Sequence, residues 1–139
     1  VMAASNFPWD LDEAFRRRLE KRIYIPLPDR AARLEMLQRN MGTVRSAADI
    51  DYGALADRTA NYSGADLRTL CREAAMKPVR RLLDEFEPEE IQARRRAGAL
   101  ALPEVGAADL AAALAATRPS VAPAACRRYR AWAEEFQAV

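Results

Sequence analysis

Histidine is absent from the 139-residue chain, and cysteine occurs only twice, as Cys71 and Cys126. Without histidine the chain has no imidazole for acid–base catalysis, and no clustered cysteines supply a zinc site, so we expect no metal ligands. Two isolated cysteines are typical of reduced, buried thiols in an intracellular protein. No apolar run approaches the roughly 18 residues of a membrane span, and we therefore expect none.

Lysine is almost as scarce, because only Lys21 and Lys77 accompany the arginines among 22 basic residues. The 20 acidic residues leave a net charge of +2, which argues against a surface field for nucleic acid or for an anionic membrane. The basic residues alternate with acids and not with aromatic side chains, so we expect no nucleic-acid partner. Abundant arginine beside abundant alanine is typical of GC-rich coding, which makes any single arginine a weak functional signal.

The first 28 residues have an α/β pattern. Residues 1–4 (VMAA) and 21–28 (KRIYIPLP) are short apolar or β-branched segments that end at turn residues, and they are predicted as strands. Residues 10–18 have helical spacing and acids in the first turn, which predicts a helix. Because the chain starts inside a predicted strand, we expect a piece of a longer protein that runs to a natural C-terminus.

Everything after Pro28 is predicted to be helical. Asp29 and Ser63 are N-cap residues for helices at 29–41 and from 63 onward, and a shorter helix follows Asp51. Pro78 is expected to kink the long helix or to start a second one. Residues 86–104 are predicted as a short helix plus a loop, and residues 107–117 and 123–137 as two more helices. The predicted fold class is therefore α/β followed by all-α.

Three adjacent arginines, Arg16, Arg17 and Arg18, precede the second predicted strand in DEAFRRRLEKRIYIPLP (residues 12–28). Such a row is either a solvated helix end that balances the helix dipole or a means of binding an anion. The solvated helix end describes Arg16 well. Residue type alone does not decide between the two interpretations for Arg17 and Arg18.

Two longer stretches resemble the AAA ATPases. VMAASNFPWDLDEAFRRRLEKRIYIPLPD (residues 1–29) resembles their second region of homology, and YSGADLRTLCREAAMKPVRRL (residues 62–82) resembles the opening of their helical lid. Within this superfamily the sequence is similar to the microtubule-severing clade, most of all to the A-like 2 branch of the katanin catalytic subunits. The segments CREAAMKPVRRL, TRPS (117–120) and RYRAWAEEFQAV (128–139) carry that likeness.

The resemblance implies a domain organisation. Residues 1–28 would be the C-terminal end of a parallel-sheet AAA large domain, residues 29–118 the helical lid, and residues 119–139 the C-terminal helix of this clade. In the family a P-loop strand separates the two strands predicted here. We therefore expect residues 1–28 to be poorly ordered or mispacked when the chain is made alone, because buried sheet groups would lack partners.

The resemblance also assigns catalytic roles. Asn6 matches the sensor-1 residue that helps to orient the attacking water, although an asparagine before Pro8 can also simply cap a loop. Arg17 and Arg18 match the arginine fingers that reach the nucleotide of a neighbouring subunit. A guanidinium suits a γ-phosphate because it stays charged and can donate two hydrogen bonds at once.

Further residues match nucleotide-binding and assembly positions. Gly64 and Ala65 match small residues on the adenine side of the nucleotide, although S-G-A-D also describes an ordinary helix start. Met36 and Asn40 are expected in the same region, where a methionine at helical spacing can equally be core. Three aromatic residues match the C-terminal helix that supports ring assembly, and they also suit an apolar face packed on its own domain: Tyr129, Trp132 and Phe136.

The implied parent is an ATP-driven homo-hexameric ring that severs microtubules in the cytoplasm, at the spindle, centrosome or basal body. Its cofactor would be ATP with magnesium, bound mainly upstream, since the chain contains no G-x-x-x-x-G-K-[ST]. We expect the chain alone to be inactive. The alternatives are a spastin-type, fidgetin-type or ESCRT-disassembling ATPase, and a non-catalytic helical interaction module.

Overall fold

The computed structural model describes residues 2–136. The chain divides into two compact units, which are described separately: a central unit, Leu27–Ser120, and a terminal unit, which combines Val1–Pro26 with Val121–Val139. Within residues 2–136 all regular structure is helical, and the single isolated β-bridge pairs Ser46 with Val105. No helix in this part of the chain is both long and apolar enough to cross a membrane.

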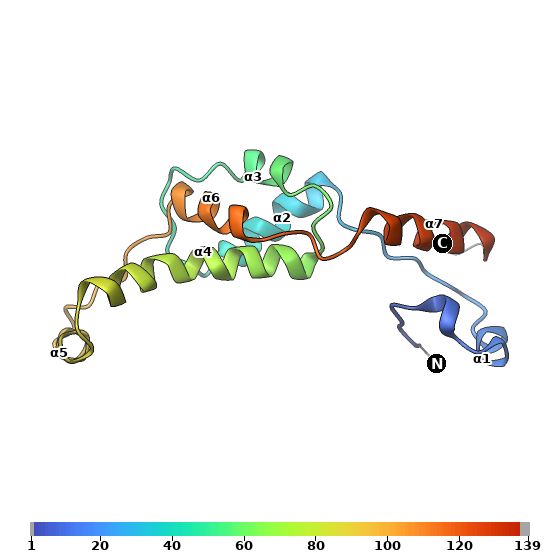
Figure 1. Ribbon diagram of the computed structural model, residues 1–139, viewed down its shortest axis with the longest axis horizontal. Coiled ribbons are helices and arrows are strands. Elements are labelled where there is room, and N and C mark those ends of the chain that lie inside the picture. The colour runs from blue at the N-terminus through green and yellow to red at the C-terminus, as the bar shows by residue number, and fades with distance from the viewer. Residues whose placement is uncertain (1, 137–139) are drawn as a thin grey trace. The chain divides into compact units, whose positions relative to one another are not determined.

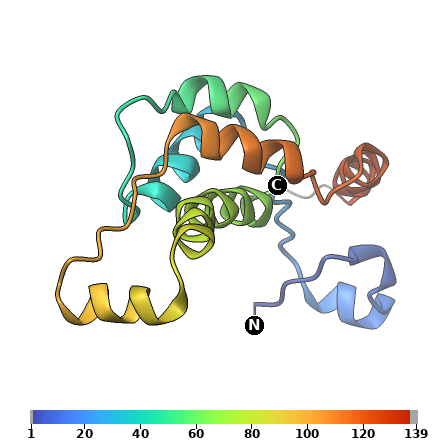
Figure 2. The same cartoon turned by 60° about the vertical axis from the view of Figure 1, so that its left-hand side comes forward.

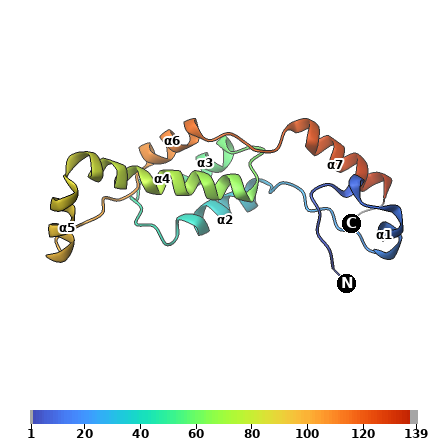
Figure 3. The same ribbon diagram turned by 60° about the horizontal axis from the view of Figure 1, so that its bottom comes forward.

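The central unit consists of α2 (Arg30–Met41), α3 (Tyr52–Arg58), α4 (Gly64–Glu85), α5 (Pro88–Arg96) and α6 (Ala107–Ala116). Helix α4 packs against both α2 and α6, and α2 packs against α3 (Figure 1). Helix α5 follows at the far end of α4 in every view (Figures 2 and 3). The hydrophobic core lies among α2, α3, α4 and α6 and contains Leu37, Met41, Leu55, Ala56, Tyr62, Leu67, Leu70, Cys71, Ala74, Val105, Leu110 and Ala113.

The helices of the central unit begin where the sequence predicts. Asp29 accepts a hydrogen bond from the Ala32 amide (2.8 Å), and Asp51 accepts one from the Ala54 amide (2.9 Å). Ser63 and Asp66 form the reciprocal capping box, in which each side chain accepts from the other residue's backbone N–H. These short polar side chains satisfy amides that the first helical turn leaves without partners, which fixes the starts of α2, α3 and α4.

Helix α4 continues without interruption through Pro78 to Glu85, so the prediction of a second helix starting at Pro78 is wrong. Proline removes one intrahelical hydrogen bond, and its ring crowds the preceding turn. Pro78 is among the fully buried side chains, so its ring packs in the interior, where burial offsets part of that cost. The expected short helix and loop at 86–104 are confirmed as α5 and the segment that follows it.

The terminal unit contains a 3-10 helix, η1 (Pro8–Asp10), and the helices α1 (Glu13–Arg18) and α7 (Pro123–Glu135). The helix predicted at 10–18 is thus shorter, with Asp12 as its N-cap through the Ala14 amide (2.8 Å). Helix α7 confirms the last predicted helix up to Glu135, and Gln137, where that helix was expected to end, lies outside the described residues.

The two predicted strands do not form: residues 2–4 and 21–28 contain no strand, and Val1 lies outside the described residues. A strand requires a neighbour for its backbone hydrogen bonds, and no other described segment pairs with either stretch. Ile23 and Ile25 are consequently 75% and 84% exposed. The helical part of the predicted fold is confirmed, whereas the strand assignments are wrong for this chain.

Candidate functional site

In the central unit, three of the predicted nucleotide-facing residues are brought together. Gly64 and Ala65 form the exposed first turn of α4, and Met36 lies on the neighbouring α2, where it is 38% exposed. A Cβ atom at Gly64 would lie 3.8 Å from the Met36 sulfur. The methionine thioether therefore borders the start of α4 at van der Waals distance. Asn40, four residues further along α2, is half-buried, and its side chain forms no hydrogen bond within residues 2–136.

Asp66 forms a polar junction beside this first turn. Its Oδ2 atom accepts hydrogen bonds from the Ser63 amide (2.8 Å), the Ser63 hydroxyl (2.8 Å), the Ser120 amide (3.2 Å) and the Ser120 hydroxyl (3.1 Å). Burial of this carboxyl raises its pKa, but the four hydrogen bonds outweigh burial and hold the pKa below its ordinary value. The capping box was predictable from local spacing. The link to Ser120, 54 residues away, was not.

A neighbouring hydrogen bond holds the chain segment that includes Ser120. The hydroxyl of the buried Tyr62 donates to the Thr117 carbonyl at 2.6 Å, and burial together with the nearby Asp66 charge raises the pKa of Tyr62. The segment Thr117–Ser120, which leads towards α7, is thus attached to the N-terminal end of α4 at two points. Direct hydrogen bonds therefore join this end of α4 to the segment Thr117–Ser120.

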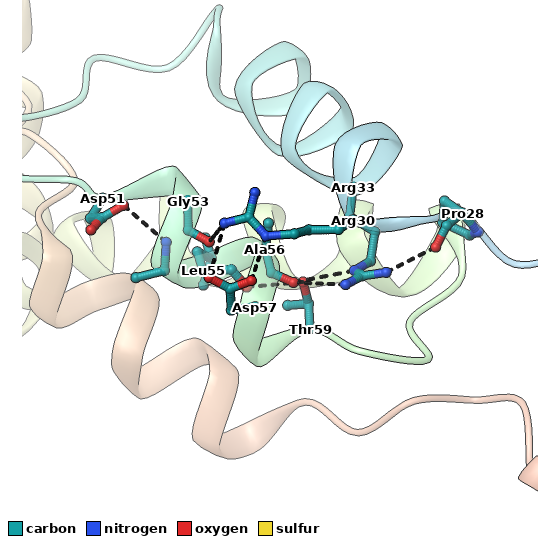
Figure 4. A network of polar contacts seen from close by, with 10 residues as sticks. Pro28, Arg30, Arg33, Asp51, Gly53, Leu55, Ala56, Asp57 and Thr59 are labelled. Carbon is teal, nitrogen blue, oxygen red and sulfur yellow. Dashed lines mark hydrogen bonds and ion pairs between the residues drawn. The ribbon is translucent and has the colours of Figure 1, made fainter.

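Two arginines of α2 attach the segment before that helix to α3 (Figure 4). The buried Arg33 donates through Nη1 to the Pro28 carbonyl (3.0 Å) and through Nε and Nη2 to the Ala56 carbonyl (3.3 and 3.0 Å). Arg30 donates to Asp57 through Nε (2.5 Å) and Nη2 (3.0 Å), and this hydrogen bonding lowers the pKa of Asp57. Sequence reasoning missed both arginines, because their partners in α3 lie 27 residues from Arg30 and 23 residues from Arg33 along the chain.

In the terminal unit, the three arginines of α1 occupy three different environments. The Arg17 Nη2 atom lies 2.5 Å from the Glu13 carboxylate, one turn away, and both side chains are mostly exposed. Arg18 is exposed, and its side chain forms no hydrogen bond or ion pair within residues 2–136. Arg16 is half-buried, with its guanidinium 5.4 Å from the centroid of the Phe136 ring. The expectation that Arg16 belongs to a solvated helix end is wrong, because this ring covers it.

Asn6 lies beside Tyr129 of α7 in the same unit. The Tyr129 hydroxyl donates to the Asn6 backbone carbonyl at 2.6 Å, while Asn6 itself is exposed. The Tyr129 ring packs on Trp9 (5.0 Å between centroids) and stacks on Tyr24 (6.4 Å). The structure therefore brings together one predicted catalytic residue and one predicted assembly residue, which sequence spacing did not suggest.

The other two predicted assembly residues, Trp132 of α7 and Phe136 directly after it, form a second aromatic pair. The Trp132 and Phe136 rings lie 5.2 Å apart, and the Phe136 ring lies beneath the guanidinium groups of Arg16 and Arg22. Tyr129 thus contacts Trp9 and Tyr24, whereas Phe136 contacts Arg16 and Arg22. Within residues 2–136, no cluster of side chains suited to hold a metal ion is present.

Two family models match the chain. Residues 49–93 match the AAA+ lid domain, and residues 83–136 match the Vps4 C terminal oligomerisation domain. Together they cover the helices from α3 to α7. These matches identify the chain as a segment of the AAA+ class that contains its lid domain.

The chain is also similar to curated katanin p60 ATPase-containing subunits. The chain is 45% identical over 139 residues to the A-like 1 form of katanin p60 from Danio rerio, covering 100% of this chain and 28% of the relative. It is 44% identical to the A1 form from Strongylocentrotus purpuratus (100% and 27%) and 41% identical to the A-like 2 form from Xenopus tropicalis (100% and 26%). The chain is therefore a katanin-like AAA segment that spans about a quarter of these relatives' length. These identities do not separate the katanin branches.

Solved structures agree with this assignment. A chain from the structure described as "Structural Basis for Katanin Self-Assembly" matches 95% of this chain with a TM-score of 0.81 and 40% identity, over 46% of its own length. The FIGL-1 AAA domain matches 96% of this chain with a TM-score of 0.78 and 34% identity, over 42% of its length. Both similarities extend across nearly all of the chain.

Proposed function

We propose that this chain is the C-terminal part of a katanin-like AAA ATPase, a homo-hexameric ring that hydrolyses ATP and severs microtubules. The observation that carries the proposal is 44–45% identity to katanin p60 ATPases along essentially the whole chain. In this proposal residues 1–28 complete the large domain, residues 29–118 are the lid, and residues 119–139 form the C-terminal helix. Its place of action would be the microtubule cytoskeleton of the cytoplasm.

ATP with magnesium would be bound mainly by parts of the protein outside this chain, which contains no P-loop sequence. The residues present fit the adenine side of a nucleotide. Gly64 and Ala65 leave the first turn of α4 open, and the Met36 side chain beside them offers a polarisable apolar surface. Bound ATP would supply the phosphoanhydride bond whose cleavage drives the ring. We expect the isolated chain to bind ATP weakly and not to hydrolyse it.

Arg17 and Arg18 would act on the nucleotide of the adjoining subunit. Both side chains lie on the exposed surface of α1, so neither requires a buried contact to be broken before it can reach a neighbour. The Arg17–Glu13 pair is exposed on both sides, and exposed pairs contribute little, so a phosphate can replace the carboxylate. A planar guanidinium suits the spread charge of the phosphoryl-transfer transition state.

The test uses the full-length protein that contains this chain. Arg18→Ala is expected to lower the kcat for ATP hydrolysis by roughly 10³-fold while ATP binding is retained, because an arginine finger acts on the transition state. Arg18→Lys should also be strongly impaired, because an ammonium lacks the planar fork. Arg95→Ala, which removes an exposed arginine of α5, is the matched control and should leave kcat unchanged.

Three outcomes decide the proposal. Full hydrolytic activity of Arg18→Ala would remove the finger assignment. Severing is assayed separately, by following the length of stabilised microtubules with ATP present. An active ATPase that leaves microtubules intact would instead favour one of the alternative substrates, such as the filaments that ESCRT-disassembling relatives act on. A full-length protein without a P-loop would favour the non-catalytic interaction module.

A further inference from the structure

The contact between Tyr129 and Asn6 joins the C-terminal helix to the proposed hydrolytic site. The two residues lie 123 positions apart, and the Tyr129 hydroxyl lies 2.6 Å from the Asn6 carbonyl oxygen. Such a short O–H···O distance is at the strong end of the usual range. The ring that carries this hydroxyl packs on both Trp9 and Tyr24, and these contacts restrict its orientation.

The segment around Asn6 is fastened by α7 at more than one point. Arg128, the neighbour of Tyr129, places its guanidinium 3.7 Å from the centroid of the Trp9 ring. Within the segment itself, the Phe7 amide donates to the Ser5 hydroxyl (3.0 Å), and the Asp10 amide donates to the Phe7 carbonyl (3.1 Å). The backbone of residues 5–10 therefore has its own turns and is attached from outside through α7.

The Asn6 side chain is left available by this arrangement. Asn6 is exposed, and its amide group forms no hydrogen bond within residues 2–136. Tyr129 donates its hydrogen bond only to the backbone carbonyl of Asn6. It can therefore fix the position of the Asn6 backbone while the side-chain amide stays free to bind another group. This is the geometry expected of a residue that positions another, because catalytic groups must be held to within a fraction of an ångström.

We infer that Tyr129 is a positioning residue for Asn6, so that docking of α7 sets the rate of ATP hydrolysis as well as supporting assembly. The inference rests on the proposed function, in which Asn6 orients the attacking water. A ring whose α7 helices are undocked would then bind nucleotide normally and hydrolyse it slowly. A purely structural role predicts instead that only the aromatic ring of Tyr129 matters, through packing on Trp9 and Tyr24.

The experiment removes the hydroxyl and keeps the ring. In the full-length protein, Tyr129→Phe is expected to lower kcat roughly 10-fold, because the Asn6 side chain is then held less accurately, with KM for ATP within about 2-fold. Tyr24→Phe is the matched control: it removes a hydroxyl from the same aromatic stack, and the Tyr24 hydroxyl forms no hydrogen bond within the described residues. The control should leave kcat and the oligomeric state unchanged.

A double-mutant cycle separates positioning from stabilisation. If Tyr129 acts through Asn6, then Tyr129→Phe should have no further effect on kcat in an Asn6→Ala background, because the positioned amide is already absent. Equal losses in both backgrounds would overturn the inference. So would unchanged kcat in Tyr129→Phe when the parent protein hydrolyses ATP.

A second measurement needs no ATPase activity. In the full-length protein, Tyr129→Phe should shift the backbone amide resonances of residues 5–7, 9 and 10, whereas Tyr24→Phe should shift them less. If the parent protein does not hydrolyse ATP, both the proposed function and the link between Tyr129 and hydrolysis are contradicted. The resonance shifts would still report whether Tyr129 holds the Asn6 backbone. Unshifted resonances in Tyr129→Phe would overturn the inference whatever the ATPase assay shows.

Discussion

At the scale of single residues, Asp66 combines a helix cap with a long-range attachment. One carboxylate oxygen accepts four hydrogen bonds, two from Ser63 and two from Ser120, and the side chain is 7% exposed. A buried carboxylate is tolerated only when its oxygens are satisfied, since an isolated buried charge is very costly. The arrangement therefore makes the linker at Ser120 a required partner of the α4 N-terminus.

Replacement of Asp66 tests this arrangement. Asp66→Asn is expected to lower the free energy of unfolding by about 1–3 kcal/mol. The neutral side chain loses the charge-assisted hydrogen bonds, and an NH2 group in place of the Oδ2 oxygen would face the N–H and O–H donors of Ser63 and Ser120. Asp84→Asn changes an exposed aspartate near the other end of α4 and should stay within about 0.5 kcal/mol of the parent. Urea unfolding followed by circular dichroism measures both variants. Equal stabilities of the two variants would contradict the assigned role of Asp66.

The same carboxylate predicts a pH dependence. The native pKa of Asp66 is lowered, so its stabilisation is complete above the unfolded-state pKa of about 4 and is lost as the pH falls through the lower native pKa. The difference in unfolding free energy between the parent and Asp66→Asn should therefore be full at pH 7 and shrink below about pH 4. A difference that grows on acidification would have the wrong sign for this assignment.

The two cysteines differ in their surroundings and should differ in reactivity. Cys71 is 3% exposed in the core of the central unit, and burial raises its pKa to about 11, whereas Cys126 on α7 is half-buried. The thiolate is the reactive form, so at pH 8 iodoacetamide should modify Cys126 well before Cys71. Mass spectrometry of peptides from the native chain measures the order of labelling, with urea-unfolded chain as the control in which both react. Earlier labelling of Cys71 would contradict its placement in the core.

At the scale of elements, the helices could be predicted because their signals are local. Asp29, Asp51 and Ser63 cap the helices that follow them, and the apolar spacing within each helix identifies the buried face. The prediction of two strands was wrong because the formation of a strand depends on a distant partner and not on local signals. Ile23 and Ile25 have β-branched side chains, but a strand is completed by a partner that no local pattern can supply.

The end of α5 provides an element-scale test. Gly98 follows the helix with a φ of +67°, and its amide donates to the Arg95 carbonyl at 3.1 Å. No atom lies within 4 Å of a Cβ placed there, so a substitution changes only the backbone energy. Gly98→Ala is expected to destabilise the end of α5 by about 1 kcal/mol, and Gly98→Asn by less, because asparagine tolerates this conformation better. Amide exchange across α5 measures both, and equal protection in the two variants would contradict the prediction.

At the scale of the whole molecule, the candidate site was only partly predictable. The residue types and their family positions identify Asn6, Arg17, Arg18 and Gly64, and their roles remain proposals. Contacts between distant segments were not predictable, since Tyr129 and Asn6, like Asp66 and Ser120, are linked by the fold and by no sequence spacing. Helical periodicity showed that Tyr129 belongs to an apolar face of α7 but gave no information on what that face contacts.

Limited proteolysis tests the chain as a whole. The central unit has a continuous core, whereas residues 19–26 of the terminal unit form no helix or strand and carry the exposed Ile23 and Ile25. Proteases require a locally extended, accessible backbone, so trypsin should first cut after Lys21, which is exposed in this stretch. Cleavage after Arg33 should be much slower, because that side chain is buried and donates to two carbonyl groups.

In the full-length protein, the neighbouring strand that the resemblance implies would pair with residues 19–26, and cleavage after Lys21 should slow at least 10-fold. Strong protection of Lys21 in the isolated chain would show that residues 19–26 are ordered without any such neighbour.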